Sequence, residues 1–145
     1  MAKKLDRPIA APASKRDDGT QLARVRGICL SLPNAVEKLS HGAPTFFTPA
    51  RVFATFADNH HGDAHVAVWL PAGPGVQAAL IEEDPLVYFR PPYVGVAGWV
   101  GVEVSGVDDA QLGSLIRESY RLIASKKSAA KKTVVKKSAV KSPRQ

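Results

Sequence analysis

The sequence predicts an α+β domain in which a mainly antiparallel sheet packs against helices. Apolar residues recur at helical spacing near the start and the end of the central region. Between these two segments, several short runs alternate in the manner of strands and are separated by turns that contain Pro or Gly. Strands joined by short turns pair antiparallel, so we expect the order helix, strands, helix, strand, helix.

The first predicted helix has apolar residues at Leu22, Val25 and Cys29, which is the spacing of one helical face. Pro33 ends it. Cys29 lies on the inward stripe, so we interpret it as a small buried hydrophobe rather than a reactive thiol. It is the one cysteine of the chain and cannot form an internal disulfide, which fits a reducing compartment.

Strands are predicted near 45–48 and 51–57, around a turn that contains proline, and again over 64–71. In the third strand, alternation places Val68 and Trp69 on opposite faces. These segments are the centre of the expected sheet.

A short helix is predicted near 74–83, with Pro74 suited to its first turn and Pro85 beyond its end. The following residues, LVYFR, are compatible with a strand or an irregular link. The last strand is predicted over 98–105, where valines alternate with other residues.

The closing helix has the clearest boundary signals in the chain. Asp108 is suited to the N-cap, and Gln111 stands three residues later, as in a capping box. Val107 and Leu112 occupy the positions of a hydrophobic staple. The helix is predicted to span about residues 109–124.

Charge is distributed unevenly along the chain. Residues 126–145 contain eight basic residues and no acid, and residues 1–16 contain five basic residues and one acid. Residues 17–125 contain seven basic and twelve acidic residues. The sequence therefore predicts an acidic body with basic arms.

Three regions follow from these patterns. Residues 1–18 are expected to form a disordered basic arm, and 19–125 the folded domain. Residues 126–145 form a loose five-residue repeat of lysine pairs, and because closely spaced like charges repel, we expect a disordered, extended tail.

The tail is suited to a polyanion, since lysines that bind phosphates release condensed counterions. Its Ala, Ser and Val residues offer no code for base edges, so we expect non-specific contact with DNA. A solubilising tail is the alternative, and a membrane surface is disfavoured because aromatic and leucine anchors are missing from it. The expected nucleic-acid-binding residues are Lys126, Lys127, Lys131, Lys132, Lys136, Lys137, Lys141 and Arg144.

Four potential metal ligands lie in the stretch NHHGDAH: His60, His61, Asp63 and His65. Their spacing matches no established metal signature, so a solvated turn is the better interpretation. We expect no metal and no other cofactor.

The stretch PPYVGVAGWVG, residues 91–101, is predicted to be a structural corner. Its prolines fix an extended conformation, its glycines permit positive φ or close packing, and it leads into a strand rather than a phosphate-binding helix. A shallow aromatic pocket beside it stays open as an alternative. The candidate pocket residues are His41, Tyr93 and Trp99.

Three motifs together resemble the MmcQ/YjbR family of small bacterial proteins: SHGAPTF at 40–46, DPLVYF at 84–89 and PPYVGVAGWVGV at 91–102. The resemblance covers about residues 20–125. It implies an α+β fold similar to secretion-chaperone-like folds, and members are often labelled DNA-binding through a double-wing arrangement. It implies no catalytic residues.

The expected function is that of a non-enzymatic, DNA-associated protein that contacts phosphates through its lysine-rich tail. A wing that grips DNA needs positive surface, whereas the body is acidic, so the arms are expected to supply most of the affinity. The alternative is a protein- or small-ligand-binding module that acts through the sheet or the Tyr93/Trp99 loop. An enzyme with His41 as acid–base group is disfavoured, because no nucleophile or phosphate loop accompanies it. We expect a cytoplasmic location, which is compatible with association with the nucleoid, and the oligomeric state stays open.

Overall fold

The structure, a computed structural model, describes residues 14–139, with side chains described up to residue 125. The helices are α2 (Thr20–Leu30), α3 (Val76–Glu83) and α4 (Asp109–Ala139). The strands are β1 (Val36–Ser40), β2 (Ala43–Phe47), β3 (Val52–Asp58), β4 (Val66–Leu70), β5 (Tyr88–Phe89) and β6 (Val100–Glu103). Single turns of 3-10 helix are η2 (His60–Gly62), η3 (Val94–Ala97) and η4 (Val104–Gly106).

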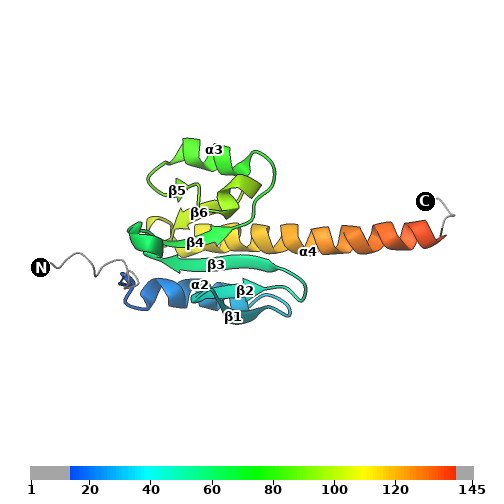
Figure 1. The fold of residues 1–145 in the computed structure, drawn as a ribbon, viewed down its shortest axis with the longest axis horizontal. Helices are drawn as coiled ribbons and strands as arrows, with labels where there is room; N and C mark the ends of the chain where they lie inside the picture. The colour runs from blue at the N-terminus through cyan, green and yellow to red at the C-terminus, as the bar shows by residue number, and fades with distance from the viewer. Residues whose placement is uncertain (1–13, 140–145) are drawn as a thin grey trace, which may run out of the picture.

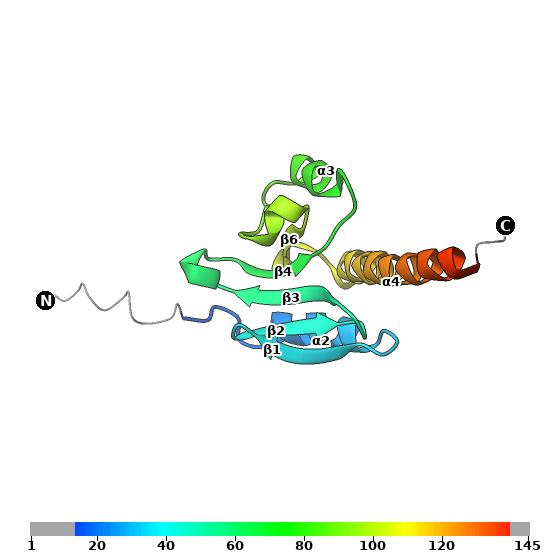
Figure 2. The ribbon, with the colours of Figure 1, turned by 45° about the vertical axis from the view of Figure 1, so that its right-hand side comes forward.

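The six strands form one antiparallel sheet in the order β1-β2-β3-β4-β6-β5. Helices α2 and α4 cover one face of this sheet, here called the helix side (Figure 1). In the turned view of Figure 2, α4 lies to the right of the strands, α2 lies behind β1 and β2, and α3 lies apart from both helices, beyond β6. The predicted α+β class with an antiparallel sheet is confirmed.

The main core lies between the sheet and the helix side. Phe56, Val68, Val102 and Tyr88 pair in one row across four neighbouring strands and are all buried. Because directly paired residues point to the same face, this row is packed against the helices as a unit. Two sets of helical residues close the core, Val25 and Cys29 from α2 with Leu112, Ile116 and Ile123 from α4.

Most predicted elements are present. The strands expected near 45–48, 51–57, 64–71 and 98–105 correspond to β2, β3, β4 and β6, and the short helix corresponds to α3. The LVYFR segment contains the two-residue strand β5. Strand β1 has no counterpart in the sequence-based prediction.

Helix α4 begins where the capping pattern placed it. The Asp108 carboxylate accepts a hydrogen bond from the Gln111 backbone N–H at 2.8 Å, which is the N-cap bond. The Gln111 side chain does not turn back to close a capping box. Its Nε2 instead donates to the Tyr88 hydroxyl at 3.2 Å and so connects α4 to the edge of the sheet.

The predicted end of α4 is wrong, because the helix continues to Ala139. The extended conformation expected from residue 126 therefore does not hold for 126–139. Ala and Lys are both strong helix formers. A helix already nucleated by the packed domain also grows without a new nucleation cost, which outweighs repulsion between neighbouring lysines. Residues 140–145 lie outside the described part of the chain.

The described part of the expected N-terminal arm is held against the domain. The Asp58 carboxylate at the end of β3 accepts hydrogen bonds from the backbone N–H groups of Arg16 and Asp17 at 2.7 and 3.1 Å. Asn59 donates from its amide to the Ser14 carbonyl at 2.7 Å. The disorder predicted for residues 14–18 is therefore wrong. Residues 1–13 lie outside the described residues.

None of the helices within residues 14–139 is both long and apolar enough to cross a membrane.

Candidate functional site

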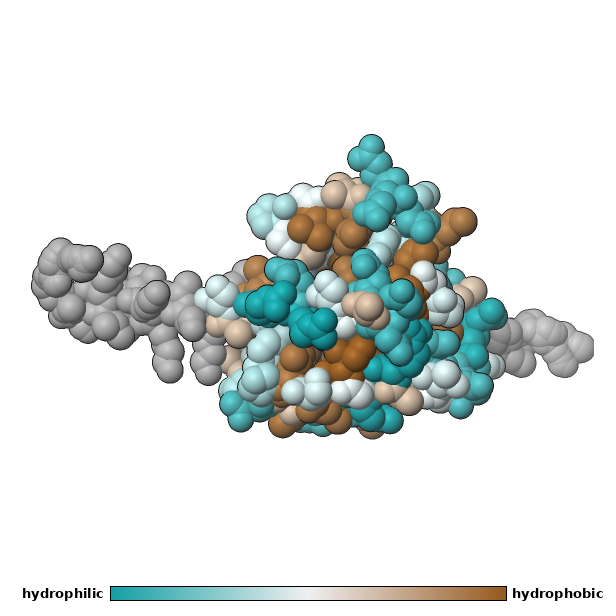
Figure 3. All heavy atoms as spheres, turned by 180° about the vertical axis from the view of Figure 1, so that it is seen from behind, coloured by the Kyte–Doolittle hydropathy of each residue, from teal (hydrophilic) through white to brown (hydrophobic). Residues whose placement is uncertain are grey.

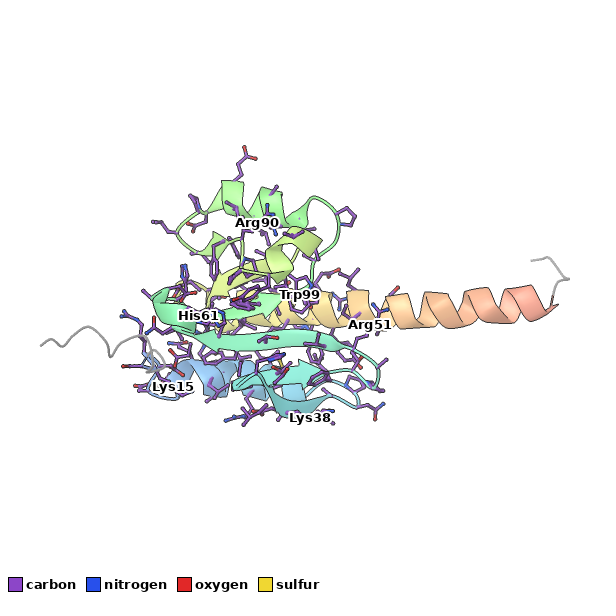
Figure 4. The ribbon with its side chains drawn as sticks, in the orientation of Figure 1. Lys15, Lys38, Arg51, His61, Arg90 and Trp99 are labelled. Carbon is purple, nitrogen blue, oxygen red and sulfur yellow. The ribbon has the colours of Figure 1, made fainter. Side chains whose placement is uncertain are left out.

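The face of the sheet opposite the helix side, here called the outer face, carries one continuous row of paired residues. The row crosses all six strands and consists of Lys38, Thr45, Thr55, Trp69, Gly101 and Phe89. It runs from an exposed cation at the β1 edge to an aromatic cluster at the β5 edge. Figure 4 labels Lys38 at the β1 end of this row and Trp99, which directly precedes β6, farther across the sheet.

A second hydrophobic cluster lies on the outer face. Ala57, Ala67 and Trp69 are buried there, and Val94 and Trp99 pack against them. The opposite faces predicted for Val68 and Trp69 are confirmed, since Val68 belongs to the main core. Both faces of β4 are therefore buried.

The segment 91–101 forms the corner that the sequence predicts. It leads into β6 through Gly98, whose φ of 94° is a conformation that favours glycine. The α3 residue Gln77 fixes the corner from outside, since its Nε2 donates to the carbonyls of Gly95 and Trp99 at 2.9 and 2.5 Å. Trp99 is half-buried in this arrangement.

Tyr93 differs from the rest of the corner. Its φ and ψ are 67° and −67°, and its side chain is 73% exposed. The Val94 N–H donates to the Pro92 carbonyl across it at 2.7 Å, so Tyr93 is the centre of a three-residue γ-turn with positive φ.

The structure does not bring the three candidate pocket residues together. His41 lies exposed in the β1–β2 turn with a φ of 53°. Strands β3 and β4 lie between that hairpin and β6, which follows Trp99. The histidine next to Tyr93 is His61, whose Nε2 lies 3.4 Å from the Tyr93 hydroxyl. Sequence reasoning missed this neighbour because the two residues are 32 positions apart.

The histidine turn between β3 and β4 is more closely packed than a solvated turn. His65 pairs with Glu103 through Nδ1 at 2.7 Å and stacks on the Phe89 ring at 3.9 Å. The His60 ring lies 5.0 Å from the Trp69 ring, edge to face. Burial, together with the neighbouring His61, lowers the pKa of His60 below its ordinary value. His61 is exposed.

Two buried polar atoms, Nε2 of His60 in this turn and Nε1 of Trp69 in β4, have no hydrogen-bond partner among the described residues. Among the side chains described, no group of three or more His, Cys, Asp or Glu residues is placed to hold a metal. The turn is thus an aromatic and imidazole cluster rather than a set of converging metal ligands.

Cys29 is fully buried in the main core, as predicted. Its desolvation raises the pKa of the thiol far above the ordinary value. Cys29 therefore contributes to the packing of the core.

Three arginines on α2 and α4 are neutralised by neighbouring carboxylates. Arg24 pairs with Asp109 at 2.7 Å and also donates to the carbonyls of Val104 and Val107. Two further pairs of the same kind are Arg26 with Glu37 and Arg121 with Glu118. Figure 3 shows that this side of the molecule presents hydrophilic and hydrophobic residues interspersed.

Cations elsewhere are not engaged in this way. Lys38, Arg51 and Arg90 are exposed, and the ion pairs between described residues include none of them. The Lys38 ammonium lies 4.8 Å from the centre of the Phe47 ring. Figure 4 shows these three residues and Lys15 spread around the sheet in the view of its outer face.

The backbone of the expected DNA-binding tail is described only in part. Lys126, Lys127, Lys131, Lys132, Lys136 and Lys137 belong to α4. Lys141 and Arg144 lie outside the described residues. The structure thus places the start of the lysine-rich segment on a helix that leaves the domain (Figure 1).

Comparison with solved structures finds a similar fold in the crystal structure of the Deinococcus radiodurans protein DR2400, with its DUF419 domain. The TM-score is 0.61 at 22% identity, over 70% of this chain and 77% of that one. The comparison with curated proteins found no match.

The YjbR family model matches residues 30–122, which is more than half of the chain. The matched region contains the whole sheet, α3 and the first part of α4, up to residue 122. The chain belongs to the YjbR family.

Proposed function

We propose that this protein associates with DNA without reading its sequence, and that the lysine-rich segment 126–145 supplies most of the affinity. The observation that carries the proposal is the segregation of charge, with eight basic residues and no acid in that segment. Lysines that neutralise phosphates release condensed counterions, which favours binding to any duplex. A location in the cytoplasm at the nucleoid follows from this proposal.

The helical course of α4 to Ala139 supports the proposal physically. A segment that is already helical loses less conformational entropy on binding than a fully disordered one. The fourteen helical residues beyond 125 would extend about 21 Å at about 1.5 Å each, which reaches along roughly six base pairs of duplex.

The helix side of the body is expected to add little to the affinity for DNA. Three of its arginines are held in ion pairs, so a phosphate would have to compete with carboxylates already in place. The described body is also acidic in sum, which opposes the approach of a polyanion.

The proposal is tested by fluorescence anisotropy of a labelled DNA duplex titrated with the full chain at several salt concentrations. The log–log slope should be several units, at about 0.9 for each phosphate neutralised. Deletion of 126–145 should remove most of the affinity and most of the slope. A matched control replaces the eight basic residues with Gln, which keeps helix propensity but removes charge, and it should behave like the deletion. Equal affinity of the deleted and full chains would overturn the role of the segment.

Sequence preference is tested separately by competition. Unlabelled duplexes of unrelated sequence should displace the labelled duplex equally well, because phosphate contacts carry no base information. A competitor that displaces the labelled duplex about tenfold less effectively than the others would contradict non-specific binding.

We propose a binding role rather than a catalytic one. His41, the candidate acid–base group, is exposed at a hairpin turn, and none of the side-chain hydrogen bonds between described residues involves it. The second candidate function is a protein- or ligand-binding module that uses the outer face, and the exposed ring of Tyr93 favours it. Chemical-shift changes confined to residues 91–101 on addition of a partner would support that module.

A further inference from the structure

Tyr93 is in a strained backbone conformation, with φ 67° and ψ −67°. A γ-turn with positive φ costs a residue other than glycine on the order of 1–3 kcal/mol, and such strain clusters at functional sites. The side chain does not recover this cost by burial, since it is 73% exposed. Glycine would adopt the same turn without a Cβ penalty.

Strained backbone converges on this point from a second segment. The β3–β4 turn contains three further non-glycine residues with positive φ, Asn59, His61 and Ala64. His61 Nε2 lies 3.4 Å from the Tyr93 hydroxyl, and the His60 ring lies 6.0 Å from the Tyr93 ring. Two distant parts of the chain thus present an exposed imidazole and an exposed phenol side by side.

Charged side chains of both signs lie around this pair, and two of them are cations that are in no described ion pair. Arg90 lies three residues before Tyr93 and is exposed. Lys15 lies near the His61 end of the sheet, where its neighbours Arg16 and Asp17 bond to Asp58 (Figure 4).

Two acids close to the pair are already engaged. Asp58 receives two backbone N–H groups, and Glu103 pairs with His65 and accepts from the Val66 N–H at 3.0 Å. A third acid, Asp63, is exposed in the same turn as His61 and accepts the His65 N–H at 2.9 Å. The cations of Arg90 and Lys15 must outweigh this carboxylate for an anionic ligand to bind here.

We propose that Tyr93 and His61 form a stacking platform for an unpaired nucleobase, with Arg90 and Lys15 beside it for the flanking phosphates. Aromatic rings next to cations are the chemistry by which proteins hold single strands, since every base has a π face. In a duplex those faces are stacked inside the helix, so the platform selects a single strand of DNA or RNA. This site is separate from the lysine-rich segment and extends the proposed association with nucleic acid.

The test uses the full chain and two labelled probes at one salt concentration, the single strand dT20 and a 20-base-pair duplex. Tyr93→Gly should weaken dT20 binding about 5- to 100-fold, the loss expected for one stacked base, and leave duplex binding within about a factor of two. The substitution removes no charge, so the slope of log affinity for dT20 against log salt concentration should stay the same. The affinity itself should be lower at every salt concentration. Tyr93→Phe keeps the ring and should bind dT20 like the unaltered chain. An rU20 probe should weaken in parallel with dT20, because stacking does not depend on the sugar.

Stability separates a functional ring from a structural one. Tyr93→Gly should unfold at the same or a higher temperature, because it relieves the positive φ. Leu86→Ala, at a residue that is 88% exposed, is the matched control and should change neither binding nor stability.

Three outcomes would overturn the platform. The first is unchanged dT20 binding by Tyr93→Gly, even where the lysine-rich segment still holds duplex. The second is a lowered melting temperature, which would make the ring structural. The third is a protein partner whose binding depends on Tyr93 while dT20 binding does not. Loss of duplex binding on deletion of 126–145 leaves the platform untouched, so the two proposals fail independently.

Discussion

The ring of Phe89 lies directly against Gly101, its paired partner in β6, where three ring carbons would stand less than 3.0 Å from an added β-carbon. Real β-carbons essentially never approach other atoms so closely. The absence of a side chain at 101 thus allows the short strand β5 to close the sheet and allows Phe89 to stack on His65.

We therefore expect Gly101→Ala to destabilise the domain by about 1–3 kcal/mol, because the ring must move within a packed cluster. Urea denaturation measures this loss. Gly27→Ala is the matched control, since Gly27 is exposed on α2 with open space around it. The control should stabilise the protein by up to about 1 kcal/mol, as alanine favours a helix more than glycine does. Equal stability of Gly101→Ala and the unaltered chain would contradict the packing described.

Asp108→Ala should destabilise the protein by about 1 kcal/mol, because the Gln111 N–H loses its acceptor at the start of α4. Thermal unfolding followed by circular dichroism gives the change. Asp108→Asn retains a cap oxygen and should recover most of the stability. If Asn is as harmful as Ala, the effect is due to charge and not to the cap.

The Arg26–Glu37 pair should make stability depend on acid pH. Arg26 donates to both carboxylate oxygens at 2.7 and 2.8 Å, and these bonds hold the pKa of Glu37 below its ordinary value. A lowered carboxyl pKa contributes stability above the unfolded value of about 4.3, and this contribution is lost as the pH falls through the folded value.

Glu37→Gln should thus cost no more than about 1 kcal/mol at neutral pH. The difference from the unaltered chain should shrink as the pH falls below the unfolded value of about 4.3 and vanish once the lowered folded pKa has been passed. Urea midpoints across this range measure it. Glu118→Gln, in a pair whose members are 62% and 74% exposed, is the control and should change little. A difference that persists in acid would mean that the amide side chain disturbs packing instead.

His60 should cause a second loss of stability nearer neutrality. Its pKa is lowered, so the unfolded chain takes up a proton first as the pH falls below about 6.5, and the folded state is destabilised until the folded pKa is passed. His60→Phe keeps a ring against Trp69 but cannot be protonated, so its stability should fall less between about pH 7 and about pH 5.

The control for this experiment is His41→Asn, at an exposed turn residue with positive φ that Asn tolerates. It should retain the pH dependence of the unaltered chain. Because His61 and His65 lie near His60, assignment of the individual titrations by NMR completes the measurement. An equal loss of stability in His60→Phe would assign the effect to those neighbours.

The sequence predicted those helices and strands whose buried apolar residues recur at helical spacing or alternate along the chain. Strand β1 was not predicted because it is an edge strand without a buried stripe of apolar residues. Its apolar residues Val36 and Leu39 are 48% and 75% exposed. The end of α4 was predicted wrongly for a different reason. A repeat of lysine pairs has no apolar period, yet it continues a helix that tertiary packing had already started.

The candidate site was predictable only in part. The aromatic and glycine composition of 91–101 correctly indicated a corner beside the sheet. No sequence pattern indicated that Tyr93 would adopt a γ-turn with positive φ. Bulky residues rarely adopt positive φ, and no sequence motif predicts where they do. Nor could spacing show that His61, rather than His41, would lie beside Tyr93, since sheet order decides which turns become neighbours.

Strand β1 lies at the border of the sheet, and no described strand pairs with its free side. Such a border is a template for intermolecular aggregation, and Leu39 adds an exposed apolar side chain to it. Glu37 and Lys38 place opposite charges at consecutive positions of this strand, which is how soluble proteins discourage fibril growth. Concentrated samples in which both charges are removed should therefore become turbid on warming before the domain itself unfolds.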